Sequence, residues 1–98
     1  MTALSSFHER MVDNNKKEYC IILYPCKELN DYIQGRITGI IYVITGKPEI
    51  PSAWMRHTNS GIEYMRFTCT DEQYRMITET ICMEYGDLLK YEFRCLEE

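Results

Sequence analysis

The stretch from Ile62 to Cys95 constrains the fold most, because a strand pattern, a helix pattern and a second strand pattern follow one another there with clear boundaries. Residues Ile62–Cys69 alternate in hydrophobicity, which predicts a half-buried strand. One face of that strand carries Met65, Phe67 and Cys69, with Glu63 sharing their parity near the edge.

A helix is predicted directly after this strand. Thr70 and Gln73 have the spacing of a capping box, in which each side chain bonds the other residue's backbone N–H. Apolar residues then recur at helical spacing, and Gly86 is expected to end the helix. These residues are Tyr74, Ile77, Ile81, Tyr85 and Leu88. A final strand is predicted where Tyr91, Phe93 and Cys95 alternate with charged residues.

The first half of the chain is harder to divide into elements. Tyr19–Tyr24 is an almost continuous apolar run, which is typical of a central strand buried on both faces and stopped by Pro25. Cys26–Gln34 favours a short helix that ends at Gly35. Arg36–Thr45 is dense in β-branched residues, so we expect a strand there, with Gly39 as a possible bulge.

Together these elements predict an α+β fold of one domain spanning residues 1–98. The order strand, helix, strand, strand, helix, strand is that of a ferredoxin-like βαββαβ sandwich, four antiparallel strands with two helices on one face. A capping-box pattern at Ser6–Glu9 adds a short N-terminal helix within an arm of residues 1–16. A long loop, residues 46–60, is expected to protrude between the second and third strands.

This loop is the first candidate for a functional site, because a long connection in a small domain is usually functional or disordered. It holds two of the three prolines and the only tryptophan. Prolines restrict the backbone before them to extended conformations, and Trp and Arg are enriched at binding hot spots. The predicted partner-binding residues are Lys47, Pro48, Ile50, Pro51, Trp54, Met55, Arg56 and His57. The alternative for Trp54 is a lid on the core.

Charge and cysteine usage narrow the possible functions. Residues 1–70 carry eight basic and seven acidic groups, net +1, whereas residues 71–98 carry three and eight, net −5. This acidic C-terminal third argues against broad contact with a phosphate backbone and is compatible with docking on a basic protein surface. The five cysteines include no Cys-x-x-Cys pair, so we expect free thiols that behave as small buried hydrophobes rather than a zinc site or a disulfide.

Two other functions remain open. A ferredoxin-like sheet can bind RNA through aromatic residues of its central strands, and Tyr64 in Gly61–Phe67 is one stacking candidate, although Ile62 replaces the first aromatic of that pattern. A thiol-dependent enzyme would need a base near its cysteine, for which His57 with Cys69 or Cys26 is the available pair. No catalytic motif, cofactor site or metal site is predicted, and neither a signal sequence nor a membrane span is expected, which favours the cytoplasm.

In size, acidity and its proline-bearing loop, the chain resembles the anti-RecBCD accessory proteins of P22-like phages. The residues that carry this resemblance are Lys47-Pro-Glu-Ile-Pro51 and Trp54. The resemblance implies a non-enzymatic phage protein that binds the RecC subunit, modulates the host RecBCD nuclease-helicase in DNA recombination, and recruits a host prolyl isomerase through the loop. We therefore predict a protein-protein interaction module that acts in the host cytoplasm.

Overall fold

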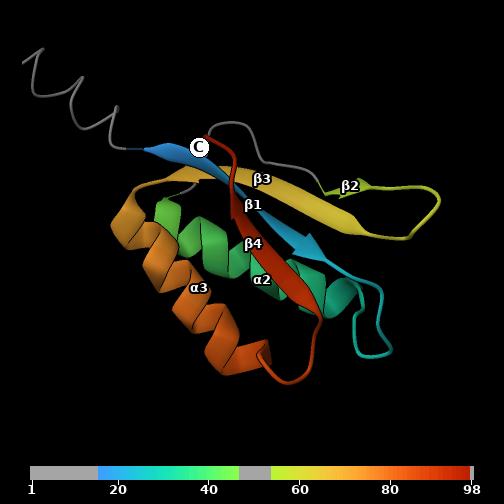
Figure 1. Ribbon diagram of the computed structural model, residues 1–98. Helices are drawn as coiled ribbons and strands as arrows, with labels where there is room; N and C mark the ends of the chain where they lie inside the picture. Colours follow the sequence, from blue (N-terminus) through green and yellow to red (C-terminus); the bar gives the residue numbers. More distant parts are fainter. Residues whose placement is uncertain (1–15, 47–53, 98) are drawn as a thin grey trace, which may run out of the picture.

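Four antiparallel strands and two helices form the computed structural model, which describes residues 16–46 and 54–97 (Figure 1). The strands are β1 (Lys17–Leu23), β2 (Met55–Arg56), β3 (Glu63–Cys69) and β4 (Tyr91–Cys95), and the helices are α2 (Asp31–Thr45) and α3 (Asp71–Tyr85). Their spatial order in the sheet is β2-β3-β1-β4, with both helices on one face. This βαββαβ arrangement confirms the predicted α+β, ferredoxin-like fold.

The two central strands supply one side of the core. β1 pairs with β3 so that Ile21 lies opposite Met65, and both side chains are fully buried under the helices. Along both strands every second residue points to this side, as the pleat requires. The buried set confirms the predicted inward face of β3. It comprises Tyr19, Ile21 and Leu23 on β1 and Met65, Phe67 and Cys69 on β3.

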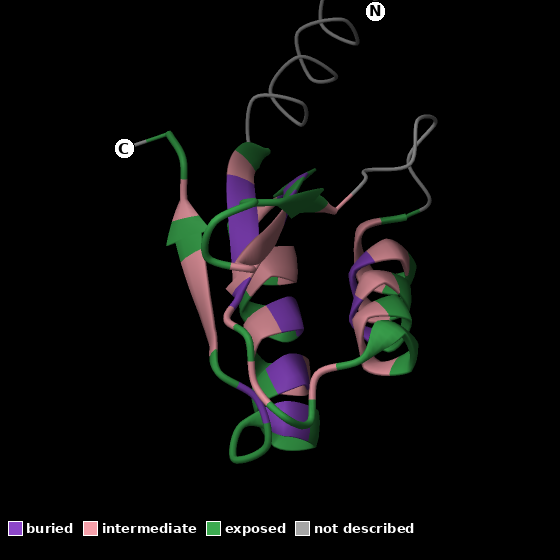
Figure 2. Cartoon of the chain, turned by 90° about the vertical axis from the view of Figure 1, so that its right-hand side faces the viewer, coloured by how far each residue is buried: buried purple, intermediate pink, exposed green. Residues whose placement is uncertain are grey.

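β1 is less enclosed than its apolar sequence predicts. Ile22 and Tyr24 are only half-buried, because no helix covers the second face of the sheet in the described part of the chain (Figure 2). The expectation of a strand buried on both faces is therefore met only on the helix side and at Cys20. The sheet has a covered face and an open face.

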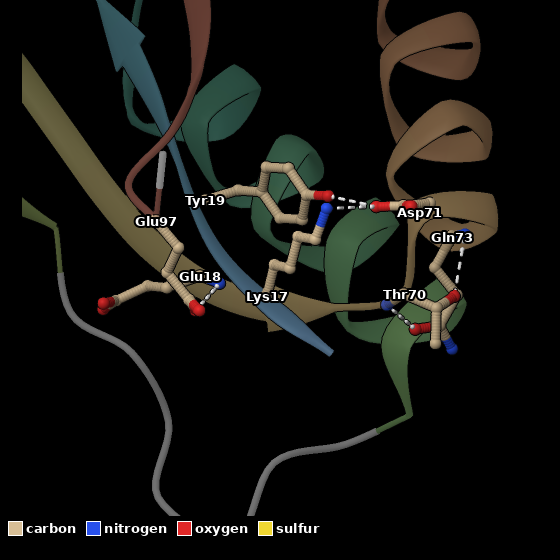
Figure 3. Close-up of polar contacts among 7 residues, drawn as sticks. All are labelled: Lys17, Glu18, Tyr19, Thr70, Asp71, Gln73 and Glu97. Carbon is tan, nitrogen blue, oxygen red and sulfur yellow. Dashed lines mark hydrogen bonds and ion pairs between the residues drawn. The ribbon is translucent and has the colours of Figure 1, made fainter. Parts of the chain in front are cut away.

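The helix α3 begins as its sequence predicts. The Thr70 hydroxyl accepts a hydrogen bond from the Gln73 backbone at 3.1 Å, and the Gln73 side chain accepts one from the Thr70 backbone at 3.0 Å (Figure 3). Beside this cap, the Tyr19 hydroxyl donates to Asp71 at 2.8 Å, which ties the helix start to β1. Ile77, Ile81 and Tyr85 are buried as predicted, whereas Leu88 lies beyond the helix and is exposed.

The predictions for residues 26–45 are wrong. Instead of a short helix, a stop at Gly35 and a strand over Arg36–Thr45, one continuous helix runs from Asp31 to Thr45. The Asn30 side chain caps it by accepting from the Ile33 backbone at 2.9 Å. Its apolar residues fit a helical stripe that packs on the core, and this burial outweighs their β propensity. The stripe comprises Ile33, Ile37, Ile40, Ile41 and Ile44.

The second strand therefore lies inside the predicted loop. β2 is a two-residue strand that pairs antiparallel with β3 through Met55 and Arg56, so residues 46–60 connect α2 to β3 and do not join two long strands. The order of element types is nevertheless the predicted one, since β2 takes the place of the expected strand. The predicted N-terminal helix, with its capping box at Ser6, lies outside the described residues, as do residues 47–53.

Two glycines, one within α2 and one at its end, provide a test of this assignment. Gly39 is exposed and a Cβ added there meets no atom within 4 Å, so Gly39→Ala should stabilise the fold by about 0.5–1 kcal/mol through higher helix propensity. Gly46 ends the helix with φ of 81°, so the control variant Gly46→Ala should destabilise it. Urea unfolding measures both changes. Destabilisation by Gly39→Ala would contradict a helix at this position.

Candidate functional site

The open face of the sheet contains an apolar groove of about 400 Å³. It is built by the alternate residues of β1, β3 and β4 that point away from the helices, together with residues next to these strands. Its apolar lining comprises Cys20, Ile22, Ile62, Tyr64 and Leu96. An apolar groove with polar groups at its rim is typical of a binding site.

Polar groups lie at the rim of this groove. His57 and Ser60 line it from the β2–β3 turn, and Arg94 lines it from β4. The turn is held by its own hydrogen bonds, since the His57 backbone donates to Ile62 at 2.7 Å and accepts from Gly61 at 2.9 Å. The Ser60 hydroxyl lies 3.0 Å from Nδ1 of His57. The sequence therefore positions an imidazole and a hydroxyl beside the apolar lining.

Two ion pairs lie on the open face. Arg66 on β3 bonds Glu18 on β1 at 2.9 Å, and Arg94 bonds Glu92 on the same strand at 2.6 Å. Hydrogen bonds from Arg94 and from the Tyr24 hydroxyl lower the pKa of Glu92, and the bond to Glu92 raises the pKa of Tyr24. Each of these two arginines already has a carboxylate partner, so they give the open face no excess of positive charge.

The predicted partner-binding residues do not form one cluster in the described structure. Lys47, Pro48, Ile50 and Pro51 lie outside the described residues. Trp54 is half-buried against the core, and its indole N–H donates to the Thr38 hydroxyl of α2 at 2.8 Å. These contacts are those of the alternative reading, in which Trp54 covers the core.

The other three predicted residues are exposed. Met55 pairs with Tyr64 across β2 and β3, so the two side chains share the open face, whereas His57 lines the groove itself. Arg56 lies on the opposite side of the short strand and bonds Glu63. His57 thus lies at the groove and Met55 lies on the face that contains it, whereas Arg56 lies on neither.

Glu63 anchors the short edge strand. Its side chain is only 13% exposed, accepts a hydrogen bond from Nε of Arg56 at 2.9 Å, and also bonds the Gln34 side chain of α2. Burial disfavours its charged form, but the hydrogen bonds from Arg56 and Gln34 outweigh burial and lower the pKa of Glu63. This carboxylate therefore joins β2, β3 and α2.

All five cysteines lie within the described residues and are free thiols. Cys20 and Cys69 are buried and Cys95 packs against the core, as predicted for strand residues, whereas Cys82 is exposed. Cys69 faces the helices, where burial and the nearby Asp71 carboxylate raise its pKa to about 11. Among residues 16–46 and 54–97, no cluster of three or more His, Cys, Asp or Glu side chains has the geometry of a metal site.

Cys20 and His57 line the same groove, although sequence reasoning paired His57 with Cys69 or Cys26. Burial raises the pKa of Cys20, so its thiol is the less nucleophilic, protonated form at neutral pH. The hydrogen-bond partner of the imidazole is Ser60. This arrangement differs from a cysteine-histidine catalytic pair, which requires a thiolate and a base bonded to it.

Several groove residues were not expected to act in binding. Cys20, Ile22 and Leu96 were assigned to the core or left unassigned, because a fully apolar strand gives no signal of which face stays open. A signal was present in β4, where Glu92 and Arg94 alternate with apolar residues and so mark the exposed side of its neighbour β1. Tyr64 was the one groove residue on a strand that the sequence proposed for binding.

Comparison of the chain with protein-family models, with curated proteins and with solved structures finds no match. In the part of the chain that the structure describes, no helix has both the length and the apolar character needed to cross a membrane.

The role of Glu63 predicts a pH-dependent stability. Because the folded-state pKa of Glu63 is lowered below its ordinary value of 4.5, its contribution is present above that pH and is lost as the pH falls through the folded value. Glu63→Gln should cost about 1 kcal/mol at pH 7, a figure kept small because Arg56 is exposed, and less at pH 3. Urea unfolding at both pH values measures this difference.

The matched control is Glu28→Gln, which removes an exposed carboxylate from a loop. It should leave stability unchanged at both pH values. An equal loss for Glu63→Gln at pH 7 and pH 3 would contradict an ionised Glu63 as the anchor of β2.

Proposed function

We propose that this chain is a non-enzymatic protein-binding module whose open sheet face receives an apolar segment of a partner protein. The observation that supports it is the groove lined by Ile22, Tyr64 and Leu96, which leaves these apolar side chains uncovered by the described residues. Uncovered apolar grooves with a polar rim are typical of protein-protein sites, where one buried anchor supplies much of the affinity. The rim residues His57, Ser60 and Arg94 would orient the segment.

The chemistry of the partner follows from that lining. An aliphatic or aromatic side chain would occupy the groove, because the lining is dominated by carbon and offers few hydrogen-bonding groups. Arg94 and Arg66 flank the groove with their carboxylate partners, so the partner segment needs no strong net charge. Met55 would contribute to the same binding surface, because its side chain shares the open face.

The alternative of RNA binding is less well supported. Tyr64 does lie on the open face, as an RNA-stacking tyrosine would. Among the described residues it is, however, the single aromatic that lines the groove, the arginines beside it are ion-paired, and the chain has net charge −4. Stacking platforms for single strands combine several aromatics with surplus positive charge.

A peptide selection tests the binding proposal. Random short peptides displayed on phage are selected on the immobilised protein, and a selected peptide is then titrated against variants. We expect the peptides to share an apolar anchor. Ile22→Lys places a charge in the groove and should weaken binding about tenfold or more, which corresponds to about 1.4 kcal/mol.

The control is Thr68→Lys, which adds the same charge to the same face outside the groove, opposite Glu18. It should bind the peptide like the wild type. Equal binding by the two variants, or a failure to select any peptide, would contradict the proposal. Submicromolar binding of single-stranded RNA that is lost in Tyr64→Ala would replace it with the nucleic-acid alternative.

The particular partner that we propose is the RecBCD nuclease-helicase, bound through RecC in the host cytoplasm, with a prolyl isomerase recruited at Pro48 and Pro51. This choice of partners rests on the resemblance carried by Lys47–Pro51 and Trp54. Purified RecBCD should show changed nuclease activity on linear duplex DNA when the protein is added. Double replacement of Pro48 and Pro51 by alanine should abolish isomerase capture and leave thermal stability within about 1 kcal/mol.

Unchanged nuclease activity at saturating protein would exclude RecBCD as the partner. It would not affect the peptide-binding result, so the two parts of the proposal fail separately.

A further inference from the structure

The strand β4 has one unpaired edge. In the sheet formed by the described residues, β4 pairs with β1 alone and lies at the end of the order β2-β3-β1-β4 (Figure 1). The opposite edge is shortened to the two residues of β2, which is a common way to blunt an edge. Tyr91–Cys95 contains neither proline nor lysine and pairs with β1 without a bulge. Apart from the charged Glu92 and Arg94, this edge therefore lacks the usual features that prevent pairing with another strand.

The direction of the free backbone groups follows from the existing hydrogen bonds. The Tyr24 backbone donates to Lys90 at 2.9 Å, and the Leu96 backbone donates to Glu18 at 2.8 Å. Bonded and non-bonded residues alternate along an antiparallel pair, so Glu92 and Arg94 also bond towards β1. The N–H and C=O groups of Tyr91, Phe93 and Cys95 consequently point outward from the sheet.

A second copy of β4 fits these groups if a two-fold axis passes through Phe93. In that antiparallel register Phe93 lies opposite its own counterpart and Tyr91 lies opposite Cys95 of the second copy. Each of these pairs places outward N–H and C=O groups against each other, so that each can exchange two N–H···O bonds. The free edge is thus complementary to itself.

Charge selects this register. With the axis at Phe93, Glu92 of one copy lies opposite Arg94 of the other in a non-bonded pair, where cross-strand side chains come closest. Moving the axis by one residue places Glu92 opposite Glu92 or Arg94 opposite Arg94. Like charges in directly opposite positions destabilise a sheet, so the neighbouring registers are disfavoured.

The apolar side chains beneath this edge are incompletely covered. Tyr91, Phe93 and Cys95 are half-buried, and Phe93 makes T-shaped contacts with the Tyr74 and Tyr91 rings, with ring centres 5.9 Å and 5.8 Å apart. On α3, which contacts β4 through the Tyr74 ring, Cys82 is exposed and interacts with Tyr91, and Met83 is 87% exposed. A second copy across the axis would bring these apolar groups together.

We propose that the chain forms a symmetric dimer in which the β4 strands of two copies pair antiparallel about Phe93 and join the two sheets into one. A second copy is the occupant of the free edge because this edge is complementary to itself. Its outward N–H and C=O groups, its order of charges and its uncovered apolar side chains all match those of a second β4. The proposal does not depend on the partner bound by the open face.

A charge-reversal experiment tests the dimer. Sedimentation at about 100 μM, where a dimer of micromolar Kd is populated, should give twice the mass of one chain. Glu92→Arg places Arg opposite Arg, and Arg94→Glu places Glu opposite Glu, so each variant alone should be monomeric. An equal mixture of the two restores opposite charges at both positions of a mixed pair and should sediment as a dimer.

Each variant loses its internal Glu92–Arg94 pair whether alone or mixed, so recovery on mixing cannot come from a repaired fold. A monomeric wild type, or a mixture that stays monomeric, would overturn the proposal. Amide hydrogen exchange of the unmodified chain provides a second measurement. The Phe93 amide should exchange slowly in concentrated protein and quickly after dilution, while the Ile21 amide of the central strand stays slow. A Phe93 amide exchange rate that does not depend on protein concentration would also overturn the proposal.

Discussion

The structure depends on the one-sided burial of β1. Tyr19, Ile21 and Leu23 point into the core, where they meet both helices and the inward residues of β3. Deleting such a side chain would cost about 2–5 kcal/mol, a large part of the stability of a small domain. The same pleat forces Cys20 and Ile22 to the other face. The apolar groove is thus a consequence of the strand that forms the core.

Hydrogen bonds at the ends of elements determine how the rest of the chain is placed around that strand. The Thr70 cap and the Tyr19–Asp71 bond hold the start of α3 beside β1, and the Glu63 carboxylate joins the short β2 to β3 and α2. Trp54 adds an indole contact to Thr38 on α2. These contacts bring the turn with His57 and Ser60 to the rim of the groove, although it lies far from β1 in sequence.

The sequence predicted what local patterns determine. Short sequence patterns were enough to indicate the fold class. They are the Thr70–Gln73 capping box, the helical spacing of apolar residues in α3, and the alternation of apolar and polar residues in β3 and β4. The strand predicted for Arg36–Thr45 was wrong because β-branched residues favour a strand locally. Their burial as a helical stripe against the sheet depends on tertiary packing, which the local pattern does not show. The groove could not be predicted in full for a related reason, since which face of an apolar strand stays open is decided by where the helices pack.

The central claim is that the open face of the sheet is the binding surface, and nuclear magnetic resonance tests it most directly. An isotope-labelled sample is titrated with a peptide selected on the protein, and the amide shifts are mapped onto the sequence. The account predicts shift changes concentrated at Cys20, Ile22 and Tyr64, with the outward residues of α2 and α3 unaffected. Changes confined to the outer surfaces of α2 and α3, with the groove residues unmoved, would contradict it.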